Sequence, residues 1–155
     1  MPRETPIPPA SELELPALGP IARLLAESFD LLAARLPDAH ARMLAPLRGL
    51  ELELILDAEA LHLRFEHGVE LTAGGGELVP GCPRIECRLP TILAVLDAKL
   101  SLVEAVESDA LQVRADLDRL VLLHEGLLAY VHGAVRCPGF PELLTRLRAL
   151  AQSPP

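Results

Sequence analysis

Tryptophan is absent from the 155-residue sequence, which also holds only one tyrosine, three phenylalanines and a single lysine, Lys99. Any core must therefore be built mainly from Leu, Val, Ile and Ala side chains, and few rings are available to stack on nucleic-acid bases. The formal net charge of −8 repels the phosphates of nucleic acids and the headgroups of anionic lipids. The composition thus argues against nucleic-acid binding and against electrostatic docking on a membrane.

Long apolar runs are also missing, since none approaches the ~20 residues that a membrane-spanning helix needs. Hydrophobic residues make up 50% of the sequence, and its length suits one domain with a substantial core. Cys82, Cys87 and Cys137 cannot all pair within one chain, and no signal peptide is recognisable at the start of the sequence. We therefore expect reduced thiols in a cytoplasmic protein without stable membrane insertion.

Proline dominates the first part of the sequence, with six prolines in residues 1–20. This density rules out a continuous helix or a central strand. One interpretation is a flexible arm over residues 1–19. A docking segment is the alternative, because Leu13, Leu15 and Leu18 are interspersed with charged residues, and both interpretations stay open at this stage.

From residue 21 onward, the spacing of apolar residues predicts a defined order of helices and strands. Helices are expected at residues 21–36, 38–48 (interrupted at Pro46), 90–98, 101–107, 116–135 and 141–150. Strands are expected at residues 50–56, 61–66, 69–71, 84–89 and 110–115. This order predicts an α+β fold with a five-stranded, mostly antiparallel sheet, helices covering one face of it, and an apolar cavity between them.

The segment 116–135 is apolar on almost every side, whereas the apolar residues of a surface helix form one stripe. A chain of this size does not offer several layers of core around one helix. We therefore predict that this segment forms one wall of a cavity that holds a hydrophobic molecule.

The region between residues 92 and 120 has a distinctive arrangement of short elements. The turn Ala98-Lys99-Leu100 stands between two short predicted helices, and Ala105 lies in the second of them. The short strand 110–114 follows without a gap, and Ala115-Asp116 opens the next helix. These features resemble the sterol carrier protein 2 (SCP2) domain, a lipid-binding family, and the chain is similar to the bacterial, stand-alone members of this family.

The resemblance implies an SCP2-like domain over residues 20–135. Residues 136–155 then form a C-terminal amphipathic helix that can act as a lid. The family includes accessory proteins of quinone biosynthesis, such as that of ubiquinone, in which the domain holds a prenylated aromatic precursor. For this chain, the resemblance therefore implies a lipid or a quinone precursor as the partner molecule.

Our first functional hypothesis is non-catalytic binding or transfer of a hydrophobic ligand, such as a lipid, a fatty acyl chain or a prenylated quinone precursor. The residues expected to line the cavity are apolar and come from three predicted helical regions: Ile92, Leu96, Leu102 and Val106; Leu117, Leu120, Val121, Leu128 and Val131; and Leu143, Leu144 and Leu147. The second hypothesis is a ligandless SCP2-like interaction module that docks a partner enzyme or forms a homodimer.

Catalysis has no clear candidate residues in the sequence. His124, Glu125 and His132 offer a possible acid–base group on the apolar helix, but a position at the helix rim is the simpler interpretation. Cys82 and Cys87 lack the second ligand pair that structural zinc sites use. We therefore assign no catalytic residue, no metal site and no cofactor.

Overall fold

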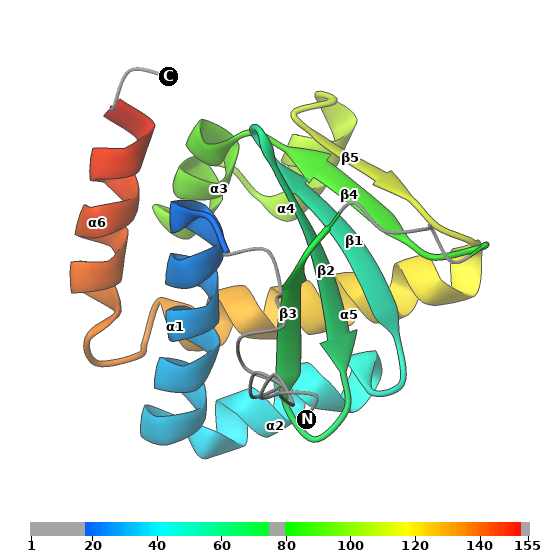
Figure 1. The fold of residues 1–155 in the computed structure, drawn as a ribbon, viewed down its shortest axis with the longest axis horizontal. Helices are drawn as coiled ribbons and strands as arrows, with labels where there is room; N and C mark the ends of the chain where they lie inside the picture. The colour runs from blue at the N-terminus through cyan, green and yellow to red at the C-terminus, as the bar shows by residue number, and fades with distance from the viewer. Residues whose placement is uncertain (1–17, 75–79, 153–155) are drawn as a thin grey trace, which may run out of the picture.

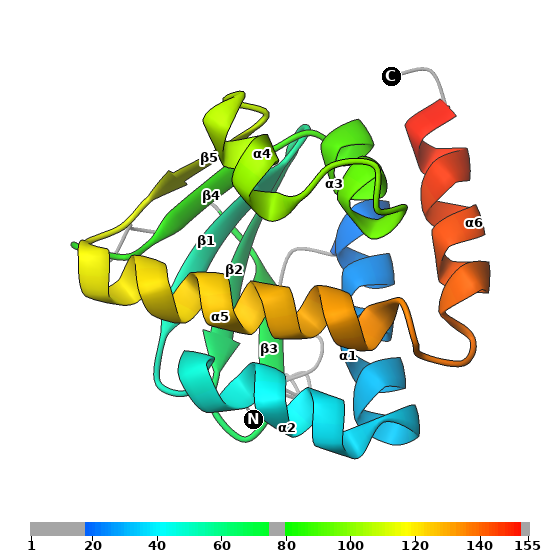
Figure 2. The ribbon, with the colours of Figure 1, turned by 180° about the vertical axis from the view of Figure 1, so that it is seen from behind.

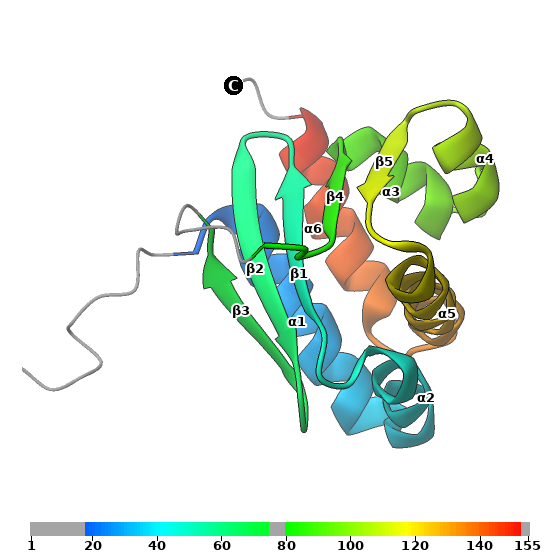
Figure 3. The same cartoon turned by 90° about the vertical axis from the view of Figure 1, so that its right-hand side faces the viewer.

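The computed structural model describes residues 18–74 and 80–152. The predicted arm over residues 1–19 thus lies outside the described residues, apart from its last two positions. The described residues form five strands and six helices, and the helices pack against one face of the sheet (Figures 1 and 3). This arrangement confirms the predicted α+β fold.

The sheet has the strand order β3-β2-β1-β4-β5. Its strands are β1 (Glu51–Leu56), β2 (Glu59–Phe65), β3 (Val69–Ala73), β4 (Arg84–Cys87) and β5 (Leu111–Arg114). All neighbouring strands are antiparallel except β1 and β4, which are parallel. The register places Leu54 opposite both Leu61 and Ile85. Because side chains alternate between the faces of a strand, this register gathers the apolar residues of three strands on the face that the helices cover.

The helices are α1 (Pro20–Arg35), α2 (Pro37–Leu47), α3 (Leu89–Leu96), α4 (Leu102–Glu107), α5 (Leu117–Ala134) and α6 (Phe140–Gln152). The predicted interruption at Pro46 does not occur, because α2 continues to Leu47. Pro46 lies in the last turn of the helix, where the hydrogen bond that proline removes affects only the helix end.

Two carboxylates at the β1–β2 turn, those of Asp57 and Glu59, fix the starts of two helices. The Glu59 side chain accepts hydrogen bonds from the backbone N–H groups of Ile21 and Ala22, at 3.0 and 3.1 Å. Asp57 Oδ1 accepts one from the backbone N–H of Leu89 at 3.2 Å. Each bond satisfies a helix N-terminal donor that has no partner within its own helix. The positions of α1 and α3 over the sheet are thereby set by the residues that surround the β1–β2 turn.

Glycines determine which face of α5 is turned inward. A Cβ built on Gly126 would lie 2.3 Å from Leu47 of α2, so a larger residue would push the two helices apart. A Cβ on Gly133 would lie 3.0 Å from Leu32 of α1. The inward face of α5 thus carries its smallest residues, and Figure 2 shows no described helix or strand in front of its opposite face.

Candidate functional site: an apolar cavity

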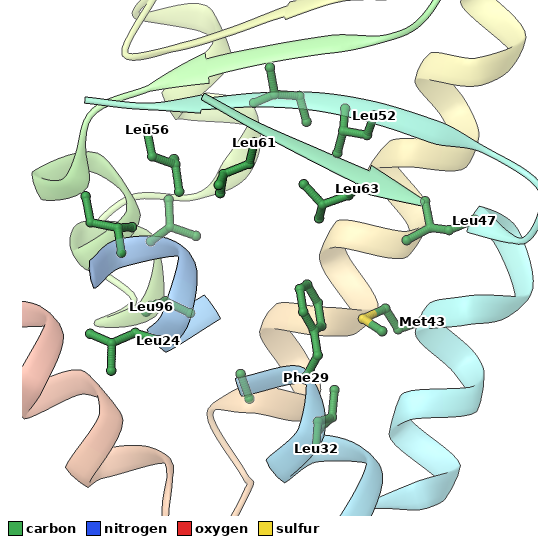
Figure 4. Packing of buried hydrophobic residues seen from close by; sticks show 14 of the residues in the cluster. Leu24, Phe29, Leu32, Met43, Leu47, Leu52, Leu56, Leu61, Leu63 and Leu96 are labelled. Carbon is green, nitrogen blue, oxygen red and sulfur yellow. The ribbon is translucent and has the colours of Figure 1, made fainter. Parts of the chain in front are cut away.

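A cavity of about 150 Å³ lies between the sheet and the helices. Its lining residues on the sheet are apolar apart from one thiol: Leu52, Leu54, Leu56, Leu63, Phe65, Ile85, Cys87 and Leu111. Leucines of β1 and β2 point across the interior toward Leu24 and Phe29 of α1 (Figure 4). No charged side chain is among the residues that line the cavity. The site is therefore suited to hydrocarbon and unsuited to an ion.

Seven of the twelve residues expected from the sequence line this cavity. They are Ile92, Leu96, Leu102, Val131, Leu143, Leu144 and Leu147. They come from α3, α4, α5 and α6, so segments more than 40 residues apart in the sequence meet at one site. Whether they contact a ligand stays a prediction.

The other five expected residues do not line the cavity, and this corrects their predicted placement. Their side chains are exposed to solvent, with relative exposures of 46% for Val106, 73% for Leu117, 38% for Leu120, 49% for Val121 and 37% for Leu128. For the four residues of α5, the physical reason is the close contact of Gly126 with α2, which turns the face with Gly126 and Leu123 inward and leaves these four residues on the other side of the helix. Only Gly126, Leu127, Tyr130 and Val131 of α5 face the cavity.

The sequence analysis missed the contribution of α1, which lines the cavity with Ile21, Leu24, Leu25, Ser28 and Phe29. A signal was present, because four of these residues lie on the helical face that carries the apolar stripe. The spacing of Ile21, Leu24 and Leu25 predicts a helical face that packs against a sheet, which does not by itself indicate a cavity, and Ser28 is a polar residue on the same face. The structure gives Ser28 a partner.

Ser28 and Tyr130 form the principal polar contact at the cavity wall. Ser28 Oγ lies 2.7 Å from the Tyr130 hydroxyl and donates to the backbone carbonyl of Leu25 at 2.6 Å. The Tyr130 ring also packs on Phe29, with ring centroids 5.2 Å apart. Burial raises the pKa of Tyr130 to about 12, although the Ser28 hydrogen bond opposes this shift. Tyr130 is thus neutral at physiological pH.

The thiol of Cys87 is neutral for the same reason. Burial, and then the nearby Asp57 carboxylate, raise the pKa of Cys87 to about 12. A protonated thiol is a poor nucleophile, so neither titratable group on the cavity wall is activated for chemistry at neutral pH.

Two ion pairs hold α6 against the rest of the domain. Both guanidinium NH2 groups of Arg146 donate to the Glu27 carboxylate on α1, at 2.6 and 3.1 Å. The hydrogen bond from Arg146 lowers the pKa of Glu27, so the pair persists below the ordinary pKa of a glutamate. Arg148 pairs with Asp97, which follows α3. These contacts join the residues of α6 at the cavity to both neighbouring helices.

The other groups considered for chemistry lie away from the cavity. His124, Glu125 and His132 are on the exposed side of α5. Within residues 18–74 and 80–152, no three His, Cys, Asp or Glu side chains are grouped so that they could hold a metal ion. None of the helices described is long and apolar enough to cross a bilayer.

The fold and the site together define a small α+β domain with a partly open apolar cavity between its sheet and a one-sided helical layer. No protein-family model and no curated protein matches the sequence. Among solved structures, the chain is similar to one described as a UbiJ-SCP2 ubiquinone synthesis protein, with 16% identity and a TM-score of 0.54 over 75% of this chain and 96% of that one. It is also similar to a sterol carrier protein 2, with 18% identity and a TM-score of 0.51 over 72% of this chain and 95% of that one. The chain therefore has the SCP2-like fold that the sequence resemblance predicts.

Proposed function

We propose that this protein binds a hydrophobic molecule in its cavity and releases it without chemical change. The observation that carries the proposal is an internal space of about 150 Å³ that is lined by apolar residues and has no charged side chain. An apolar cavity of about 150 Å³ can stay dry and take up a molecule of benzene's size. A lipid chain, a fatty acyl chain or a prenylated quinone precursor suits such a wall.

The energetic basis of binding is the removal of apolar surface from water. A ligand that buries about 300 Å² gains roughly 7–8 kcal/mol, from which the cost of association is subtracted. The neighbour described as a ubiquinone synthesis protein supports a quinone precursor as one ligand of this class. The neutral state of Cys87 and Tyr130 supports binding without catalysis.

We further propose that residues 20–135 form the ligand-binding domain and that residues 136–155 act as a lid through α6. A molecule longer than benzene needs more room than a cavity of about 150 Å³ offers. Leu143, Leu144 and Leu147 of α6 are among the lining residues, so an outward movement of α6 would enlarge the site. The two ion pairs of α6 would oppose that movement.

Removing both ion pairs with Arg146→Ala and Arg148→Ala is expected to accelerate uptake of an uncharged fluorescent hydrophobe, such as Nile red, by roughly 2- to 5-fold. Exposed ion pairs are weak, so thermal stability should change little. Stopped-flow fluorescence measures the uptake rate. Arg119→Ala is the matched control, because it removes an ion pair with Asp116 at the start of α5 and a hydrogen bond to the Gly81 carbonyl, both away from α6. Equal rates in all three proteins would contradict the role of α6 as a lid.

A second candidate function, self-association, is favoured by the exposed apolar stripe of α5. Leu117, Val121, Leu128 and Val135 are all exposed and recur at the three- and four-residue spacing of one helix face. An antiparallel pair of α5 helices joined through their exposed faces, with its midpoint at the height of residue 126, would place Asp116 of each copy opposite Arg136 of the other. It would also oppose the two helix dipoles, which is favourable. The candidate occupant of this face is thus a second copy of the chain.

Sedimentation velocity tests this candidate. We expect a concentration-dependent dimer for the natural protein and a monomer for Val121→Glu. Val103→Glu is the control, because Val103 is as exposed as Val121 but lies on α4. A monomeric natural protein across the micromolar range would exclude self-association through α5.

A further inference from the structure

Hydroxyl or thiol groups occur on four of the residues that line the cavity, yet the wall presents almost no polar surface. Ser28 Oγ contacts the Leu25 carbonyl at 2.6 Å and the Tyr130 hydroxyl at 2.7 Å, so both hydroxyls are satisfied within the protein. The thiol of Cys87 is a weak donor and acceptor, and Thr91 is partly exposed in the first turn of α3. A polar atom that entered the cavity would therefore lose its hydrogen bonds to water without replacing them, which is unfavourable.

The cavity wall is most deeply buried on the sheet. Most of the lining residues on the strands are buried, and the side chains of Leu63 and Phe65 are each 2% exposed. The lining residues on α3 to α6 include several that are partly exposed, such as Ile92, Leu102 and Leu147. These exposures place the closed end of the cavity at the sheet and its opening among these helices.

The volume of the cavity determines how much of a ligand fits inside. A dry cavity of about 150 Å³ holds benzene, a molecule of six carbons, and the cavity of this protein has about that volume. A longer, extended ligand would thus place roughly six carbons inside and the rest in the opening. An oxygen on the inner part would face an apolar wall, whereas an oxygen at the other end would stay in contact with water.

We propose that an amphiphilic ligand enters this cavity tail first, with an unsubstituted hydrocarbon end inside and its polar head outside in water. The inference rests on the proposed function, because it assumes that the cavity takes a ligand. It defines the ligand class by the far end of the molecule, which carries no hydroxyl, keto or charged group, whereas the head can be neutral or charged. A prenylated quinone precursor would accordingly enter with its prenyl end and leave its ring at the opening.

The test compares two isomers, 1,2-decanediol and 1,10-decanediol, by their displacement of Nile red. Both have ten carbons and two hydroxyls, so they differ only in the position of the second hydroxyl. A tail-first orientation keeps both hydroxyls of the 1,2 isomer in water but brings one hydroxyl of the 1,10 isomer into the cavity. We therefore expect the 1,10 isomer to bind roughly 10- to 100-fold more weakly. Complete burial of the ligand would remove both hydroxyls from water in either isomer and would produce no such difference.

Two further measurements report on the position of the head. Decanoate at pH 8 is charged but keeps its carboxylate in water, so it should bind within about tenfold of 1-decanol when about 0.15 M salt screens the negative net charge of the protein. Burial of the carboxylate would instead weaken decanoate by at least about 100-fold. With protein in excess, a water-soluble gadolinium chelate should broaden the NMR signal of 1-decanol labelled with ¹³C at its hydroxyl-bearing carbon more than that of 1-decanol labelled at its terminal methyl.

The outcomes distinguish this inference from the proposed function. Equal binding of the two isomers, exclusion of decanoate, or stronger broadening at the terminal methyl would overturn the tail-first orientation while the binding function stands. Val121→Glu is the control variant, because Val121 is exposed on α5 and does not line the cavity, and it should leave the ratio of the two isomers unchanged. A ratio that Val121→Glu abolishes would place the ligand on the outer face of α5 and would overturn both proposals, as would failure of Nile red and all four ligands to bind.

Discussion

Val131→Trp is expected to reduce binding of Nile red by more than tenfold, whereas Val121→Trp leaves it unchanged. Both residues are on α5, two to three turns apart, and both substitutions add the same indole ring. Val131 lines the cavity, so the ring fills space that the ligand needs. Val121 is 49% exposed, so its ring extends into solvent. A tenfold loss corresponds to about 1.4 kcal/mol of binding free energy.

Equilibrium titration of both variants measures this effect, with circular dichroism confirming that each is folded. The pair is informative because the sequence alone predicts that Val121 lines the cavity. Overpacking an interior position has a typical cost of about 1–3 kcal/mol in stability, so Val131→Trp should melt at a lower temperature. If Val121→Trp blocked binding and Val131→Trp did not, the ligand site would lie on the outer face of α5.

Stability is expected to fall steeply between pH 9 and pH 12. Folding raises the pKa of Cys87 from 9.0 to about 12 and that of Tyr130 from 10.0 to about 12. Each group binds its proton more tightly in the folded state, so its contribution is complete below the unfolded pKa and is lost as the pH rises through the folded one. For Tyr130, two units correspond to about 3 kcal/mol.

Urea denaturation at pH 8 and at pH 11.5 measures this loss. Tyr130→Phe should remove the part that develops above pH 10, and Cys87→Ala should remove the part that begins near pH 9. Cys82→Ala is the comparison variant: burial also raises the pKa of Cys82, but less than that of Cys87, and Cys82 does not line the cavity, so this variant should remove a smaller part of the loss. A variant lacking both Cys87 and Tyr130 that lost as much stability as the natural protein would contradict the assignment of these groups as buried and neutral.

The strands were predictable because their apolar residues alternate with charged ones. Leu52 and Leu56 are buried, and all three leucines Leu52, Leu54 and Leu56 line the cavity, so one face of β1 forms both part of the core and part of the cavity wall. The parallel pairing of β1 with β4 was not specified by this pattern, since alternation determines the face of a residue and not the direction of the neighbouring strand.

The orientation of α5 could not be obtained from its large apolar residues, because they occur on nearly every side. The informative residues were the small ones. Gly126 and Gly133 are seven residues apart and share one face, and that face lies against neighbouring helices. Close packing against α1 and α2 is possible only where α5 carries these glycines. Leu117 and Val121 lie away from this contact and are exposed to solvent.

The polar contact of the site lies beyond sequence reasoning for a different reason. Ser28 and Tyr130 are separated by 102 positions along the chain, and no local pattern pairs them. Their contact depends on the crossing of α1 and α5, which follows from the contacts of both helices with α2. The apolar character of the site was therefore predictable, whereas the contact between Ser28 and Tyr130 required the structure.

The most direct measurement of the central claim is the set of intermolecular nuclear Overhauser effects between 1-decanol and the methyl groups of the labelled protein. A ligand inside the domain should show contacts with the methyl groups of Leu54, Ile92 and Val131, which come from the sheet, α3 and α5. Contacts confined to Leu117 and Val121 would place the ligand on the outer surface and would contradict binding in the cavity.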